Sequence, residues 1–145
     1  MKTKYRIGID PDLTKSGVAI ISHAPFQKQK IEELLNCRFF EVLSKIEEFT
    51  KKGEVRVMLE AGWLNKKSNY HSAPNQEVAG RIGKNVGENH AVGKLIEEWC
   101  MVNQVPYSLI KPTNKKWDSK LFKMITNWDK RTNAEQRDAV RAAWL

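Results

Sequence analysis

Long apolar runs, closely spaced cysteines and low-complexity segments are all missing from this sequence. Because no stretch of about 18 uninterrupted apolar residues occurs, a membrane-spanning helix is excluded. The N-terminal residues include basic side chains but lack the apolar core of a secretory signal. The two cysteines, Cys37 and Cys100, match no zinc-binding spacing, and we expect reduced thiols. These absences predict a cytoplasmic protein.

Acidic residues are outnumbered by basic ones. The chain has 25 Lys and Arg against 17 Asp and Glu, which gives a formal net charge of +8. In a small protein such an excess favours a polyanionic partner, most often nucleic acid, although many basic proteins have none. With 145 residues, 41% of them hydrophobic, the chain can form one domain with a real core but not two sizeable ones. We therefore expect a single domain over residues 1–145.

Apolar periodicity and turn residues predict strands and helices in alternation. Tyr5, Ile7 and Ile9 alternate with other residues, which is strand periodicity, and a polar turn follows. We expect, in order, a hairpin over 5–22, a strand or the start of a helix over 31–37, a helix from 39 that stops at Gly53, a strand over 54–62, a helix over 76–101, a strand over 105–110, a helix opened by Thr113 or Asn114, and a last helix capped by Thr132 or Asn133. One α/β layer structure fits this order.

The long helix expected over 76–101 is rich in glycine. Each glycine costs a helix about 1 kcal/mol against alanine, so we expect this helix to lie close against another backbone or a ligand. Its glycines are Gly80, Gly83, Gly87 and Gly93. Its candidates for burial are Val78, Ile82, Val86, Val92, Leu95, Ile96 and Trp99.

Four acidic residues end strands or share a helix face. Asp10 and Glu60 each close a predicted strand, so a parallel pairing of these strands would place both carboxylates at one edge of a sheet. Glu135 and Asp138 lie three apart on the last helix, whose alanines let it approach the sheet closely. Four converging carboxylates could not all be ionised without a cation, and these hard ligands suit Mg²⁺ or Mn²⁺. Taken singly, each acid also fits an ordinary turn or helix-start residue.

Five stretches carry a family resemblance. The segments IGIDPDLTKSGVAI, MLEAGW, RIGKNVGENHAVGKLIEEW, YSLIKPTNKKW and EQRDAVRAA resemble, in this order, the RuvC-type Holliday junction resolvases of the ribonuclease H-like superfamily. The resemblance extends from Ile7 to Ala143. It implies an α/β, ribonuclease H-like fold with a central mixed five-stranded sheet flanked by helices. It also implies that the metal-binding and catalytic acids are Asp10, Glu60, Glu135 and Asp138.

The activity implied by the resemblance is metal-dependent resolution of four-way DNA junctions by paired symmetric hydrolysis, in recombination and repair. The family uses Mg²⁺ or Mn²⁺, and two ions per active site are expected. Asp10 would bridge both ions, Glu60 and Asp138 would each hold one, and Glu135 would act as a ligand or as a base. The products would carry 5′-phosphate and 3′-hydroxyl ends. A homodimer bound to branched DNA is implied, in a bacterial cell or a phage-infected host.

Aromatic and basic residues are the candidate DNA contacts. An aromatic residue three positions after the second acid contacts bases in this family, and Trp63 occupies that position. Trp63 and Tyr70 could stack on unpaired bases, or one of them could pack beneath its own loop. The lysines could contact phosphates or simply form a solvated surface. The full set is Trp63, Lys66, Lys67, Tyr70, Lys84, Lys111, Lys115 and Lys116.

Three features depart from the family pattern. Asp12 stands where the family usually has Gly, which adds an acid beside the site and alters the turn. Glu135 stands where Asp is common, so its direct contact with metal is the least secure assignment. The chain is also shorter than typical bacterial members, which suggests a phage-type or divergent member.

Three other readings compete with the resolvase. A ribonuclease H-like nuclease of the pre-ribosomal-RNA type would cut structured RNA instead of DNA. An actin-like ATPase has a similar first hairpin, but it needs a second lobe for which this chain has no room. A catalytically inactive junction-binding module would lack the chemistry, and the presence of four acids in the expected order argues against it.

Overall fold

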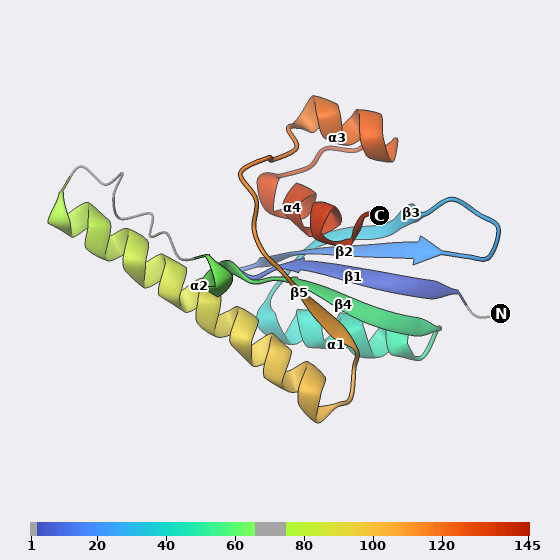
Figure 1. Cartoon of the computed structure of the whole chain (residues 1–145), viewed down its shortest axis with the longest axis horizontal. Helices are drawn as coiled ribbons and strands as arrows, with labels where there is room; N and C mark the ends of the chain where they lie inside the picture. The colour runs from blue at the N-terminus through green and yellow to red at the C-terminus, as the bar shows by residue number, and fades with distance from the viewer. Residues whose placement is uncertain (1–2, 66–74) are drawn as a thin grey trace.

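The chain folds around a mixed five-stranded sheet (Figure 1). The computed structural model describes residues 3–65 and 75–145. The strands are β1 (Lys4–Asp10), β2 (Ser16–His23), β3 (Lys30–Cys37), β4 (Glu54–Glu60) and β5 (Tyr107–Ile110), in the spatial order β3-β2-β1-β4-β5. Strands β1, β4 and β5 are parallel to one another, whereas β2 is antiparallel to both β1 and β3. The sheet expected from the sequence is confirmed, and the ambiguous segment over 31–37 is a strand.

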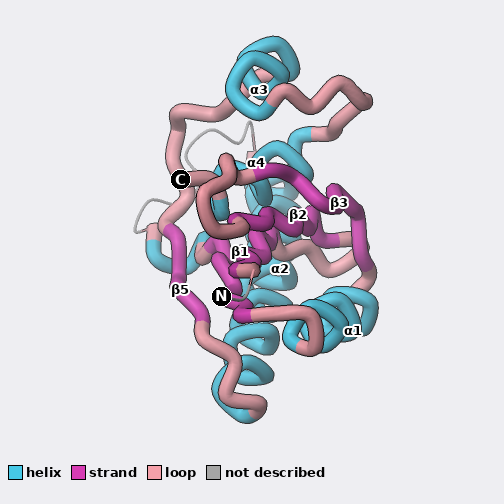
Figure 2. Tube along the Cα trace, turned by 90° about the vertical axis from the view of Figure 1, so that its right-hand side faces the viewer, coloured by secondary structure: helices cyan, strands magenta, loops and turns pink. Residues whose placement is uncertain are grey.

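Helices cover both faces of the sheet (Figures 1 and 2). On one face lie α1 (Phe39–Thr50) and α2 (Gln76–Val102), and on the other lies α4 (Ala134–Ala143), with α3 (Ser119–Thr126) beyond it. A short 3-10 helix, η1 (Gly62–Leu64), follows β4. None of the described helices is long and apolar enough to cross a membrane.

The side chains of β1 alternate between the two faces of the sheet, and each face carries its own hydrophobic cluster. Ile7 and Ile9 face α1 and α2 and are fully buried in the larger cluster, together with Ile46 and Ile96. On the opposite face, a smaller cluster joins the sheet to α3 and α4, with Phe122 as its largest buried side chain. Asp10, one residue beyond Ile9, therefore belongs to the face covered by α4.

The helix after β5 begins later than the sequence predicts. It begins at Ser119, not near Thr113 or Asn114, because the side chain of Asp118 caps it by accepting a hydrogen bond from the backbone N–H of Leu121 at 2.8 Å. The expected cap of the last helix is confirmed: the Asn133 side chain accepts from the backbone N–H of Gln136 at 2.8 Å. Residues 111–118 therefore form an irregular segment between β5 and α3.

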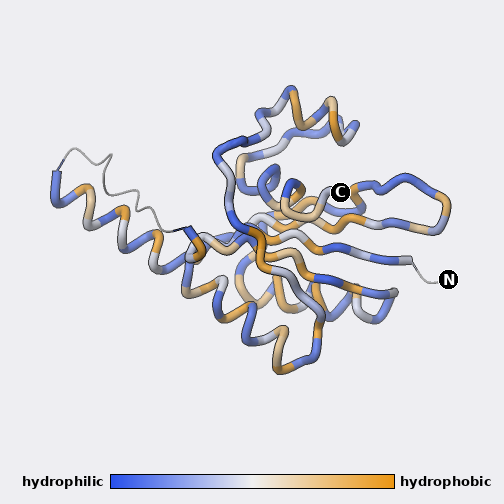
Figure 3. Tube along the Cα trace, viewed as in Figure 1, coloured by the Kyte–Doolittle hydropathy of each residue, from blue (hydrophilic) through white to orange (hydrophobic). Residues whose placement is uncertain are grey.

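Only the C-terminal half of α2 packs against the sheet. Val92 and Ile96 are buried as expected, but Leu95 is 51% exposed, so that expectation is wrong. The N-terminal half extends past the sheet edge at which β1 and β4 end, and its candidates for burial are only half-buried (Figure 1). Figure 3 shows hydrophobic residues recurring along this extending half as well.

The glycines of α2 differ in their surroundings. A Cβ at Gly93 would fall against the ring of Trp63. At Gly80 and Gly87 a Cβ would meet no described atom within 4 Å. A close approach is therefore present at Gly93, whereas no described backbone approaches Gly80 or Gly87, and an approach of a ligand to these two glycines stays a prediction.

Candidate metal centre

Two parallel neighbouring strands bring the first two acids together. In the pairing of β1 with β4, Ile9 lies opposite Leu59, and Asp10 and Glu60 are the last residues of their strands. Both carboxylates therefore lie at the same edge of the sheet, as the sequence predicts. Ala61, directly after Glu60, is fully buried, and its backbone N–H donates to the carbonyl of Ile110 at 2.8 Å, which extends the pairing with β5 past the site.

Close packing of α4 on the sheet brings the third acid, Asp138, next to Asp10 and Glu60. A Cβ at Gly8 of β1 would overlap the backbone carbonyl of Ala139, and a Cβ at Gly17 of β2 would overlap that of Glu135. The helix backbone thus rests directly on these glycines, with no side chain between them. Because α4 approaches this closely, the side chain of Asp138 reaches the sheet edge where β1 ends.

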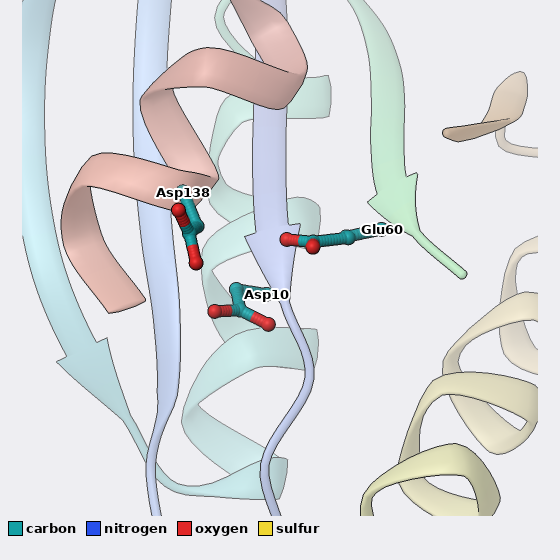
Figure 4. Close-up of side chains that lie close together, drawn as sticks. All are labelled: Asp10, Glu60 and Asp138. Atoms are coloured by element: carbon teal, nitrogen blue, oxygen red, sulfur yellow. The ribbon is translucent and has the colours of Figure 1, made fainter. Parts of the chain in front are cut away.

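Asp10, Glu60 and Asp138 form a compact trio, called the acid cluster below. Each offers a carboxylate oxygen, and the three oxygens lie within 4.8 Å of one another. In Figure 4 the three side chains, from β1, β4 and α4, point toward one another. Glu135 is exposed one turn earlier on α4 and is not in this cluster. Its role as a metal ligand stays a prediction.

Burial and like charge make the acid cluster difficult to ionise. Burial, followed by repulsion from Glu60 and Asp138, raises the pKa of Asp10 to about 8. Burial is also the largest cause that raises the pKa of Glu60 to about 7, and Asp138 adds to it. A bound divalent cation would supply the positive charge that three ionised carboxylates need at this spacing. The donor set of carboxylate oxygens suits Mg²⁺ or Mn²⁺.

Lys116 lies beside the acid cluster. Its Nζ is 2.9 Å from Oδ2 of Asp138 and 3.8 Å from Oε1 of Glu60. This ammonium group lowers the pKa of both Asp10 and Glu60 and so offsets part of the repulsion. From the sequence, Lys116 could contact phosphates or form part of a solvated surface, and the phosphate contact stays a prediction. Its ion pairs place it among the acids, and no spacing in the sequence signalled that position.

Asp12 has a structural part in the turn between β1 and β2. Its Oδ1 accepts hydrogen bonds from the backbone N–H groups of Thr14 at 2.8 Å and Lys15 at 3.3 Å. Its own N–H donates to Oγ of the buried Ser16 at 3.0 Å. These bonds form an Asx turn, so Asp12 stabilises the loop that follows Asp10 and is not part of the acid cluster.

Trp63 packs against α2. Its half-buried ring lies against Gly93 and makes an edge-to-face contact with His90, with ring centroids 6.1 Å apart. Lys94 places its Nζ 6.0 Å from the ring centroid. Contact with DNA bases stays a prediction for this residue.

The remaining candidate DNA contacts are lysines and one tyrosine. Lys84 is exposed on α2, with its Nζ 3.9 Å from a carboxylate oxygen of Glu88. Lys111 and Lys115 are exposed in the segment between β5 and α3. The candidates Lys66, Lys67 and Tyr70 lie outside the described residues.

A basic residue missed by the sequence analysis also lies close by. Arg141, one turn after Asp138 on α4, lines a hollow with Glu60, Lys116 and Asp138. Its charge lowers the pKa of Glu60. An arginine three residues after a candidate ligand faces the same way along a helix, and that spacing was the available signal.

Solved structures of RuvC resemble this fold. A T. thermophilus RuvC in complex with a Holliday junction substrate matches with a TM-score of 0.57 and 14% sequence identity, over 99% of this chain and 91% of that chain. A second Thermus thermophilus RuvC structure matches with a TM-score of 0.52 and 14% identity, over 96% of this chain and 90% of that chain. No protein-family model and no curated protein matches the sequence. The strand order, the two helix layers and these matches show that the chain has a ribonuclease H-like fold.

Proposed function

We propose that the protein is a metal-dependent endonuclease that resolves four-way DNA junctions by paired symmetric hydrolysis. The observation that carries this proposal is the acid cluster, in which β1, β4 and α4 bring three carboxylate oxygens within 4.8 Å on a RuvC-type fold. A matched structure is that of a RuvC with a Holliday junction substrate, which favours branched DNA over other nucleic acids. The net charge of +8 also suits a polyanion.

The donor set fits divalent cations of the Mg²⁺ or Mn²⁺ type, and we propose two per site. Such ions activate water for attack on a phosphodiester and stabilise charge on the leaving 3′ oxygen. Asp10, Glu60 and Asp138 would hold the ions, because their carboxylate oxygens lie within 4.8 Å of one another. We assign Glu135, exposed on the preceding turn of α4, to a ligand or base role.

The residues around the acid cluster prepare it for an anionic substrate. Lys116 lies against Asp138 and Glu60 and reduces the negative potential that would repel a phosphate. Burial around Asp10 removes water from one side of the cluster, which strengthens each charge interaction within it. A lysine from a different segment thus offsets part of the negative charge that the three acids carry when they are ionised.

We further propose that the protein acts as a homodimer. A four-way junction has approximate two-fold symmetry, and a two-fold dimer would present equal active sites to opposite strands. Sedimentation of the purified protein, alone and with a junction, tests this. Two protomers per junction is the expected stoichiometry, and one protomer per junction would contradict it.

The decisive experiment offers the protein three substrates: a synthetic four-way DNA junction, a linear duplex of the same sequence, and a structured RNA. Each is incubated with Mg²⁺, Mn²⁺ or EDTA. We expect paired symmetric nicks on the junction with either ion and none in EDTA, and we expect Asp10→Asn to abolish them. The matched control is Asp129→Asn, an exposed aspartate before α4, which should retain activity.

Other outcomes would overturn the proposal in distinct ways. Preferential cutting of the RNA would favour an RNA-processing nuclease on the same fold. Binding of the junction without cleavage in either metal would favour a junction-binding module. Cleavage in EDTA would contradict the metal-dependent mechanism.

A further inference from the structure

A hollow opens directly beside the acid cluster, and its walls carry charges of both signs. Glu60 and Asp138 of the cluster form part of it, and Lys111, Lys116 and Arg141 supply three cationic side chains. These cations come from the end of β5, the segment before α3, and α4. A ligand in this hollow would therefore touch the cations while it lies next to the proposed metal ligands.

Arg141 has unused hydrogen-bonding capacity. Its Nη1 is buried and has no hydrogen-bond partner among the described residues. Buried polar groups normally have such partners, and an unpaired donor on a charged group is costly. Lys116, in contrast, already pairs with Asp138 and Glu60. Nη1 itself is not exposed, but the Arg141 side chain lines the hollow, so an acceptor that enters the hollow would meet Arg141 there.

Trp117 holds the guanidinium in place. Cζ of Arg141 lies over the indole ring, 5.7 Å from its centroid. Contact with an aromatic face uses the flat side of the guanidinium and leaves the N–H groups at its edge for hydrogen bonds. An arginine fixed in this way presents a planar set of donors that matches two oxygens of one phosphate.

We propose that Arg141, assisted by Lys111, binds a backbone phosphate of the strand that is cut, next to the phosphodiester held at the acid cluster. This inference rests on the proposed nuclease function. Three carboxylates repel a phosphate backbone, and the cut strand needs fixed positive charge on the side where it leaves them. Arg141 supplies this charge from the same helix as Asp138, so the two side chains move together.

The test measures junction binding as a function of salt concentration. It compares Arg141→Gln, Arg141→Lys and the unaltered side chain, all in the Asp10→Asn background with Ca²⁺, so that a cation is available and the strands stay intact. Each phosphate contact contributes about 0.9 to the slope of log K against log [salt]. We expect Arg141→Gln to weaken binding about tenfold and to reduce the slope by about 1. Arg141→Lys should restore the slope, and the exposed Lys28→Gln on the β2–β3 turn should change neither quantity.

A second measurement distinguishes direct contact between Arg141 and a DNA phosphate from an indirect effect in which Arg141 only packs against Trp117. Junctions with single neutral methylphosphonate linkages are placed, one at a time, beside the cut position. If Arg141 contacts one phosphate, replacing that phosphate by a neutral linkage will weaken junction binding by the protein that retains Arg141. The same linkage will not weaken binding by Arg141→Gln, because this variant has already lost the contact. Equal losses in both proteins at every position, or an unchanged salt slope, would overturn the inference. A thermal unfolding curve for each variant shows whether it is folded.

The proposed function can fail separately. Absence of junction cutting by the protein with Asp10 intact, in Mg²⁺ and Mn²⁺, would reject the nuclease while the salt slopes still decide whether Arg141 binds phosphate. If no variant binds the junction at any salt concentration, both proposals are rejected.

Discussion

Asp10 is the most perturbed residue of the site, with a pKa raised to about 8 by burial and then by the charges of Glu60 and Asp138. Its folded-state pKa is above the unfolded value of 3.8. The folded protein therefore binds a proton that the unfolded chain releases. The stability this provides is complete below about pH 4 and is lost as the pH rises to about 8.

Replacing Asp10 by Asn should therefore stabilise the metal-free protein while it abolishes cutting. Ionisation of the buried Asp10 carboxyl group destabilises the folded protein as the pH rises above 4. Asn cannot ionise, so the variant does not lose this stability. In EDTA we expect the unfolding temperature of Asp10→Asn to exceed that of the unaltered protein by a few degrees at pH 8 and to equal it near pH 4. Calorimetry at the two pH values measures this, and Asp129→Asn serves as the control. A variant less stable than the parent at pH 8 would contradict the assignment.

The lysine beside the acid cluster should compete with metal. Lys116→Gln removes the ammonium group 2.9 Å from Asp138 and eliminates its repulsion of an incoming divalent cation. At pH 9, above the pKa values of Asp10 and Glu60, we expect several-fold tighter Mn²⁺ binding by titration calorimetry. In EDTA the same variant should be less stable, because the carboxylates lose their partner.

The neighbouring Lys115 offers a matched control for this experiment. It is exposed and forms no ion pair within the described part of the chain. Lys115→Gln should leave Mn²⁺ affinity and metal-free stability unchanged. Weaker Mn²⁺ binding by Lys116→Gln would mean that the lysine supports the metal site instead of competing for it.

At the scale of elements, the site depends on how closely α4 approaches the sheet. The helix presents the buried Ala139 and Ala143 to Gly8 of β1, and the backbone of Glu135 to Gly17 of β2. Backbone lies against backbone here, so neither partner can move aside at low cost. The distance between Asp138 and Asp10 is therefore set by two glycines that carry no chemistry.

Gly8→Ala should push α4 away and damage both stability and metal binding. The added Cβ would overlap the carbonyl of Ala139, and such overpacking costs about 1–3 kcal/mol. We expect denaturant unfolding to shift by this amount and Mn²⁺ affinity to fall. Gly87→Ala, where a Cβ meets no described atom within 4 Å, should instead gain about 0.5–1 kcal/mol of stability. An unchanged unfolding midpoint for Gly8→Ala would show that α4 adjusts freely.

At the scale of the whole molecule, metal binding should be coupled to folding and to pH. The acid cluster joins β1, β4 and α4, so an ion held by it links the sheet to the helix layer that contains α4. Because the ion requires ionised carboxylates, it must displace protons from Asp10 and Glu60 at low pH.

Mg²⁺ should therefore raise the unfolding temperature more at pH 8 than at pH 5. Ligand stabilisation grows with the ratio of free ion to its dissociation constant, and that constant is smaller when the carboxylates are already ionised. Thermal unfolding with and without Mg²⁺ at the two pH values measures the difference. Asp10→Asn should lose most of the effect, and an equal shift at both pH values would contradict the linkage.

Much of the fold could be predicted because its signals are local. Strand alternation, the cap at Asn133 and the helix period each involve only a few consecutive residues. The start of α3 was misplaced because Asp118 forms a better cap than the earlier Thr113 or Asn114. Leu95 was misassigned because it lies beside the face of α2 that carries the buried Val92 and Ile96, and helical spacing alone does not reveal how wide that buried face is.

By itself the sequence determined the strands and helices, the strand-end positions of Asp10 and Glu60, and the placement of Asp138 on the last helix. Only the tertiary structure decided which side chains meet: Lys116 joins the acids, Arg141 faces the hollow, and Glu135 stays exposed outside the cluster. The reason is physical. Periodicity and capping are properties of neighbouring residues, whereas the meeting of distant side chains depends on how closely the layers pack, and that distance is decided where α4 rests on the sheet.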